Sequence, residues 1–151
     1  MKYRKLLLFA AIFGLLTIPS AGSAQVVEIF SAAIAGTKAC GDLNVFKIKQ
    51  TVFVRLTIDT VNNTATIEIS LDQSFTDVLT LQMGAYQTSA KGFAFIASGE
   101  DIFQGHNTLE LISGTGKIGP TGVTSFTGTF VEEDDANCFS SGTIKSVKRI
   151  S

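Results

Sequence analysis

The densest group of potential metal ligands in the sequence is the acidic run Glu132-Glu133-Asp134-Asp135, which Asn137 follows. Carboxylate and amide oxygens are ligands that Ca²⁺ accepts, but the run lacks the alternating spacing and the central glycine of an EF-hand loop. Acidic runs are also typical of a solvated turn between two strands. The sequence therefore leaves calcium binding at residues 132–135 open and predicts no metal centre elsewhere.

His106 is the single histidine of the chain, and Glu100, Asp101 and Glu110 lie near it in the sequence. A Ser–His hydrolase also needs a nucleophile and a group that orients the histidine, and no motif supplies either. One histidine without a second histidine or a free cysteine is a poor ligand set for zinc. We therefore expect a non-enzymatic protein with no cofactor, and we rank a small hydrolase last among the alternatives.

The aromatic composition disfavours two further classes of protein, those that bind or cleave sugars and those that form outer-membrane barrels. The 13 acidic residues would supply the carboxylate pair of a glycosidase, but beyond residue 24 the chain has no Trp and only Tyr86. Sugar sites usually offer Trp or Tyr platforms, so lectins and glycosidases are disfavoured. An outer-membrane barrel needs girdles of Trp and Tyr at both interfaces, and this class is disfavoured for the same reason.

The first 24 residues have the three parts of a secretory signal peptide. Lys2, Arg4 and Lys5 precede an apolar run from Leu6 to Leu16, and small residues end the segment at Ala24. The apolar run is shorter than the roughly 20 residues that span a bilayer. We expect cleavage after Ala24, a secreted or periplasmic location, and no membrane span in the mature chain.

Removal of residues 1–24 changes the charge balance. Three of the 12 basic residues and none of the 13 acidic ones are lost, so nine basic residues face 13 acidic ones and the net charge is −4. Nucleic acids and anionic membranes need a basic face on their partner. The composition therefore predicts that neither is a partner.

Residues 25–151 are predicted to be one all-β domain. The clearest element is a hairpin of residues 51–60 and 64–71, in which apolar and polar side chains alternate. A two-residue turn at Asn62-Asn63 would place Ile58 opposite Ile67. One buried face is then expected, formed by Val54, Leu56, Ile58, Ile67, Ile69 and Leu71.

A second hairpin is predicted around residues 89–92, with strands at 78–88 and 93–98 and with Tyr86 opposite Phe95. Further strands are expected at 45–49, 108–113, 123–131 and 139–147. Residues 45–49 would continue into the first hairpin through a bulge. Residues 26–35 suit a strand or a short helix, and the surrounding strands favour a strand.

Seven to nine strands with short connections predict an antiparallel meander, closed into a small barrel of about eight strands or folded into a barrel-like sandwich. Cys40 and Cys138 are the two cysteines of the chain, and in an exported protein we expect them to form a disulfide. Such a bridge would place the first and last strands side by side. This favours a barrel modestly.

Phenylalanine is unusually frequent, with ten residues beyond position 24. These rings have no polar group, so they either pack a core or line an apolar cavity. The candidate lining residues are Phe53, Phe93, Phe95, Phe126 and Phe130. We expect a barrel that binds a small apolar ligand or a partner protein. The alternative is a structural or interaction protein of the cell envelope without a pocket.

Overall fold

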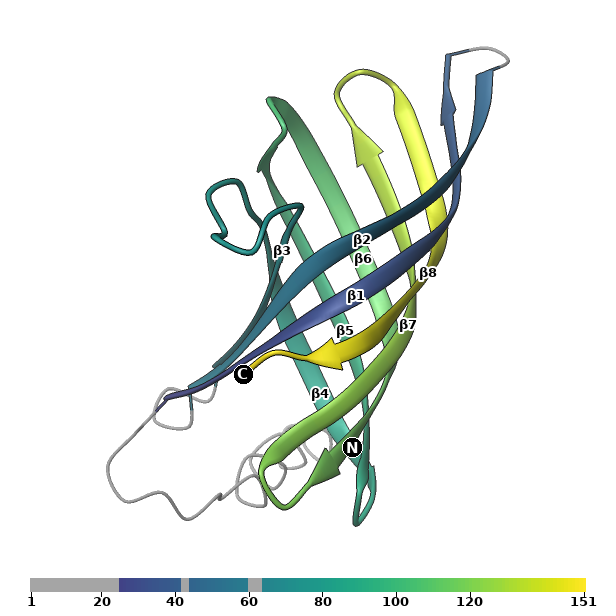
Figure 1. Ribbon diagram of the computed structural model, residues 1–151. Coiled ribbons are helices and arrows are strands. Elements are labelled where there is room, and N and C mark those ends of the chain that lie inside the picture. The colour runs from purple at the N-terminus through teal and green to yellow at the C-terminus, as the bar shows by residue number, and fades with distance from the viewer. Residues whose placement is uncertain (1–24, 42–43, 60–63) are drawn as a thin grey trace, which may run out of the picture.

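The computed structural model describes residues 25–41, 44–59 and 64–151, and these residues form a closed antiparallel barrel (Figure 1). The eight strands are β1 (Gln25–Cys40), β2 (Asn44–Asp59), β3 (Thr64–Ser70), β4 (Leu79–Ser89), β5 (Gly92–Phe103), β6 (His106–Gly119), β7 (Gly122–Asp134) and β8 (Cys138–Arg149). Each strand pairs with the next along the chain, and β8 pairs back with β1. The predicted all-β meander is confirmed, and it closes as a barrel, not a sandwich.

The seam between β1 and β8 carries the disulfide. The two strands pair from Phe30 opposite Arg149 to Cys40 opposite Cys138, with one bulge after Ser31. Cys40 and Cys138 are bonded, and their Cα atoms are 4.1 Å apart. The predicted bridge is confirmed, as is the strand across residues 26–35, which lies within β1. The bond ties the first strand to the last at the point where the sheet closes.

The predicted register of the first hairpin is wrong by two residues. Ile58 lies opposite Ala65, and Ile67 lies opposite Leu56. The last pair, Asp59 with Thr64, leaves four residues between the strands instead of two. The predicted turn at Asn62-Asn63 lies outside the described residues.

A shift of two residues preserves the inward face, because side chains alternate with a period of two. Five of the six predicted residues of that face are accordingly buried: Val54, Leu56, Ile58, Ile67 and Ile69. Leu71 is the exception, with 44% of its surface exposed, because β3 ends at Ser70 and Leu71 begins the following connection.

Two smaller predictions are also corrected. Tyr86 lies opposite Ala94 instead of Phe95, because an irregularity between Gln87 and Ser89 shifts the β4–β5 register by one residue. β2 is continuous and pairs with β1 in a single register, so the expected bulge after residues 45–49 is absent from this pairing. The uniform register lets β1 and β2 form one long curved ribbon around the barrel (Figure 1).

One half of the interior is filled by aromatic rings. Phe30 and Phe126 pack edge to face with ring centroids 5.4 Å apart, and Phe95 lies 6.5 Å from Phe126. Phe93 lies opposite Gly116 on β6, where an added Cβ would come within 2.2 Å of the Phe93 ring. The glycine therefore provides the space that the ring occupies. This half of the barrel is a packed core.

Connections alternate between the two ends of the barrel, as its up-and-down order requires (Figure 1). One end of the barrel is the end at which β1 begins and β8 finishes. Here Glu28 on β1 accepts a hydrogen bond from the Val123 amide at 3.0 Å, and Arg149 lies 3.5 Å from the same oxygen. We call this the terminal end. The other end, reached by the connections that follow β1, β3, β5 and β7, is called the open end and holds a pocket.

Candidate functional site

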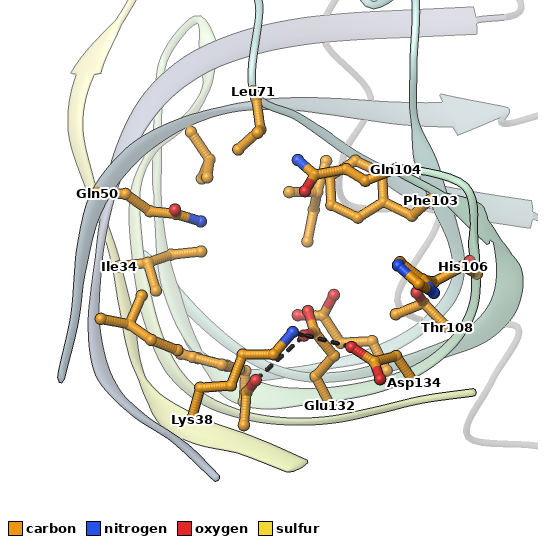
Figure 2. A pocket seen from close by; sticks show the side chains of 16 residues that line it. Ile34, Lys38, Gln50, Leu71, Phe103, Gln104, His106, Thr108, Glu132 and Asp134 are labelled. Carbon is orange, nitrogen blue, oxygen red and sulfur yellow. Dashed lines mark hydrogen bonds and ion pairs between the residues drawn. The ribbon is translucent and has the colours of Figure 1, made fainter. Parts of the chain in front are cut away.

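The pocket at the open end is a hollow of about 280 Å³ inside the barrel. Figure 2 shows side chains that project from the surrounding strands toward its centre. Its volume is at the lower limit of the usual range for small-molecule sites, about 300–1,000 Å³. A compact ligand with a short apolar part would fit.

The wall of the pocket has a mainly apolar side, which also carries Gln50 of β2, and a polar side, and Gln104 and His106 line its rim. The apolar side comes mainly from β1, β2 and β3, with one ring each from β5 and β7. Its residues are Ile34, Ile48, Val52, Ile69, Leu71, Phe103 and Phe130. The polar side comes from β1 and from β6 to β8, and we call its residues Lys38, Thr108, Glu110, Glu132, Asp134 and Ser140 the polar arc.

The polar arc follows from the strand register. Lys38 on β1 lies opposite Ser140 on β8, Ser140 opposite Glu132 on β7, and Glu132 opposite Glu110 on β6. Residues opposite one another in an antiparallel ladder project from the same face, so all four side chains point into the barrel and form one row across the four strands. Asp134 and Thr108 form a second pair one level nearer the open end.

Lys38 is held by two carboxylates of the polar arc. Its Nζ lies 2.8 Å from Asp134 Oδ2 and 3.9 Å from Glu132 Oε1 (Figure 2). Ser140 Oγ donates a hydrogen bond to Glu132 Oε1 at 3.2 Å. The Ala136 and Cys138 amides donate to Asp134 Oδ1 at 3.0 and 3.1 Å. Lys38 therefore belongs to a satisfied network.

The same network fixes the ionisation of Asp134. Burial raises the pKa of this carboxyl, but the hydrogen bonds from Lys38 and from the Cys138 amide outweigh burial and hold the pKa below its ordinary value. Asp134 is thus a structural anion. It anchors both Lys38 and the start of β8.

Glu110 differs from the other members of the polar arc. Only 3% of its surface is exposed, and its carboxyl has no hydrogen bond among the described residues. Burial, and then the charge of Glu132, raise the pKa of Glu110 to about 8. A buried carboxyl without a partner is unfavourable when ionised, so Glu110 is mainly protonated at neutral pH.

Successive residues of the acidic run point to opposite faces of β7, because side chains alternate along a strand. Glu132 and Asp134 point into the barrel, Glu133 is exposed on the outer face, and Asp135 begins the turn after β7. Asp135 Oδ1 lies 2.9 Å from His106 Nδ1 at the rim. Within residues 25–41, 44–59 and 64–151, no group of three His, Cys, Asp or Glu side chains is placed to hold a metal ion.

The five candidate phenylalanines lie in different surroundings. Phe130 lines the pocket, whereas Phe93, Phe95 and Phe126 belong to the packed core below it. Phe53 alternates with the inward Val52 and Val54 and lies on the outer face, so its assignment as a lining residue is corrected. The four inward rings therefore occupy two levels, with one ring in the pocket wall.

The polar arc was not predicted from the sequence. The parity of three side chains was a signal, since Glu110 alternates with the buried Ile112, Glu132 with Phe130, and Lys38 with Ile34. All three are thus on the inward side of their strands. The strand pattern does not show that Lys38 lies beside the two carboxyls, because that depends on closure of β1 against β8.

A second hollow of about 640 Å³ is larger but more open. Phe126 and three exposed lysines, Lys91, Lys117 and Lys145, line part of it. Its lining residues are Ser89, Lys91, Gly92, Thr115, Gly116, Lys117, Ser125, Phe126, Thr127, Lys145 and Ser146, none of which is a buried charged group. The pocket at the open end, with its buried carboxyl and apolar wall, is the better candidate site.

The chain matches no protein-family model, and no curated protein or solved structure is significantly similar to it. The part of the chain that the structure describes holds no helix of the length and apolarity needed to cross a membrane. The fold and the site define an eight-stranded antiparallel barrel with an amphipathic pocket in one end.

Proposed function

We propose that this is an exported, non-enzymatic protein that binds a small, mainly apolar molecule in the open end of its barrel. The observation that carries the proposal is the pocket of about 280 Å³ with Ile34, Ile48, Val52 and Ile69 on one wall. Apolar groups that leave water for such a wall gain about 25 cal/mol per Å² of buried surface. The packed aromatic core lies deeper in the barrel than the pocket and limits the ligand to the half nearer the open end.

Two features support export. The first 24 residues have the pattern of a cleavable signal peptide. The Cys40–Cys138 disulfide is consistent with an oxidising compartment, where such bonds form and persist. Expression of the full chain with N-terminal sequencing of the exported product tests this part. Cleavage after Ala24 is expected, and retention of residues 1–24 on the isolated protein would contradict it.

A direct binding experiment tests the pocket. Residues 25–151 with the disulfide formed are titrated with a neutral, environment-sensitive dye such as N-phenyl-1-naphthylamine. The dye is expected to bind with one site per chain. Ile48→Trp should fill the pocket and abolish binding, because Ile48 lines it.

The matched control is Lys49→Trp, which adds the same ring on the exposed side of β2 and should leave binding unchanged. The dye is excited outside the tryptophan absorption band. Absence of dye binding, or equal binding by the Ile48→Trp and Lys49→Trp variants, would contradict the proposed function.

A second candidate function is an interaction protein of the envelope. One observation favours it: the outer faces of β6, β7 and β8 carry neighbouring exposed apolar side chains, with Leu111 opposite Val131 and with Leu109 and Phe139 both opposite Glu133. Contiguous apolar patches on a surface are typical of contact sites.

Light scattering over a range of concentrations tests self-association through this patch. A Leu111→Glu variant should then restore the monomer, and a monomer at all concentrations would contradict self-association.

A further inference from the structure

We propose that the ligand of the open-end pocket is an amphiphile with a single cationic amine, whose ammonium group binds Glu110 while its apolar part lies against the β1–β3 wall. This inference rests on the proposed function and names the ligand class of the same site. It depends on three observations: the unpartnered carboxyl, the occupied lysine, and the apolar wall opposite both.

Glu110 is the buried ionisable group of the pocket that lacks a partner among the described residues. It is 97% buried, it lines the pocket, and no described residue donates a hydrogen bond to it. Buried carboxyls in folded proteins are normally hydrogen-bonded or paired with a cation. A ligand with a positively charged N–H donor would give this carboxyl both a hydrogen bond and a cationic partner.

Lys38 does not serve as that cation, because Asp134 and Glu132 already hold it. The same pairing means that Lys38 is not a free receptor for an anionic ligand. A carboxylate head, as in a fatty acid, would have to compete with two protein carboxylates for one lysine. It would also lie beside Glu110.

Carboxylates outnumber cations among the side chains around Glu110. β7 contributes Glu132 directly opposite and Asp134 one level nearer the mouth. β1 contributes Lys38, whose charge is balanced by Asp134 and Glu132. On β5, Gly99 lies directly opposite Glu110, and Asp101 lies two residues nearer the mouth. On β6 itself, His106 lies at the rim and is bound to Asp135. Three carboxyls of the polar arc thus face one lysine, and an added ammonium group would improve this balance.

The apolar wall limits the rest of the ligand. Ile34, Ile48, Val52 and Ile69 offer no hydrogen-bonding group, so hydrocarbon is the part of a ligand that suits them, and Gln50 between Ile48 and Val52 adds one amide to this wall. The volume of about 280 Å³ admits a short chain or a single ring, not a long acyl chain. An amine with a compact hydrocarbon body has this shape and polarity.

Binding of an ammonium ion should release a proton from the site. Glu110 is mainly protonated at neutral pH, and an adjacent cation favours its ionised form. The affinity for an amine should therefore rise between pH 6 and pH 8. An uncharged ligand of the same length should show no such rise.

The test uses three eight-carbon probes with different head groups, octylammonium, octan-1-ol and octanoate, each titrated calorimetrically into residues 25–151 with the disulfide intact. Octylammonium should bind about tenfold more tightly than octan-1-ol, as expected for a charge-assisted hydrogen bond, and octanoate should bind more weakly than octan-1-ol. Titration at pH 7 in two buffers of different ionisation enthalpy should reveal proton release for octylammonium alone.

Glu110→Gln should remove the preference for octylammonium and leave octan-1-ol binding within about twofold. Glu133→Gln, a neighbouring change on the outer face, is the matched control and should have no effect on any probe. Circular dichroism checks that both variants are folded. The three wild-type titrations and the proton release do not depend on a variant.

The outcomes separate the two proposals. If octan-1-ol binds but octylammonium binds no more tightly, or if octanoate binds best, the cationic ligand class is wrong while the binding function stands. If none of the three probes binds, both proposals are contradicted.

Discussion

Glu110→Gln should stabilise the barrel, and the stabilisation should grow as the pH rises. In the unfolded chain the carboxyl titrates at its ordinary value of 4.5, whereas in the fold its pKa is raised to about 8 by burial and by Glu132. The folded state therefore holds the proton more tightly. The contribution of Glu110 to stability is therefore most favourable below pH 4.5 and falls until the pH passes about 8.

The size of the effect follows from the two pKa values. They differ by about 3.5, and each unit corresponds to about 1.4 kcal/mol, so the ionised side chain lowers the free energy of unfolding by about 5 kcal/mol above pH 8. Glutamine has nearly the shape of the protonated acid and does not ionise. The two proteins should be equally stable near pH 4 and should differ by about this amount near pH 9.

Urea denaturation followed by far-ultraviolet circular dichroism, at unit steps from pH 4 to pH 9, measures this difference. Groups that titrate in both proteins largely cancel when the curves are subtracted. Glu133→Gln on the exposed outer face is the control and should show no pH-dependent difference from the wild type. A constant difference between wild type and Glu110→Gln across this range would refute the argument that Glu110 is buried without a partner.

Three further predictions concern the fold. Leu56→Ala should lower the free energy of unfolding by about 2–5 kcal/mol because it leaves a cavity, whereas Thr57→Ala on the outer side should cost far less; equal losses in urea denaturation would contradict the inward face. Reduction of Cys40–Cys138 should destabilise the barrel by about 4–5 kcal/mol in the chain-entropy model, and unfolding curves that coincide with and without reductant would contradict this. Gly116→Ala should lower the melting temperature, since its Cβ would meet a phenylalanine ring at 2.2 Å, and an unchanged melting temperature would show that the ring can move aside.

The sequence predicted the fold because the alternation of apolar and polar residues is a local property. A strand such as β2 shows it within a few residues, and the two cysteines indicated which ends of the chain meet. Register is less local. The shift of two residues between β2 and β3 keeps Leu56 and Ile67 on the same face, so the hydrophobic pattern cannot distinguish the two alignments.

The site was harder to predict than the fold, because closure assembles it. Lys38 is 94 or more positions away in the sequence from Glu132, Asp134 and Ser140, and it joins them only because β1 pairs with β8. Phenylalanine composition correctly suggested an aromatic interior. It did not separate the rings that fill the lower core from Phe130, which lines the pocket.

Isoleucine-methyl NMR during a titration with octan-1-ol tests the central claim, that the open end of the barrel binds a small apolar molecule, most directly. Ile34, Ile48 and Ile69 line the pocket, whereas Ile96 and Ile102 are exposed on the outer face of β5. The proposal predicts saturable shifts of the three pocket methyl signals, with the two outer signals unchanged. Shifts confined to Ile96 and Ile102, or no saturable shift of any methyl signal, would contradict it.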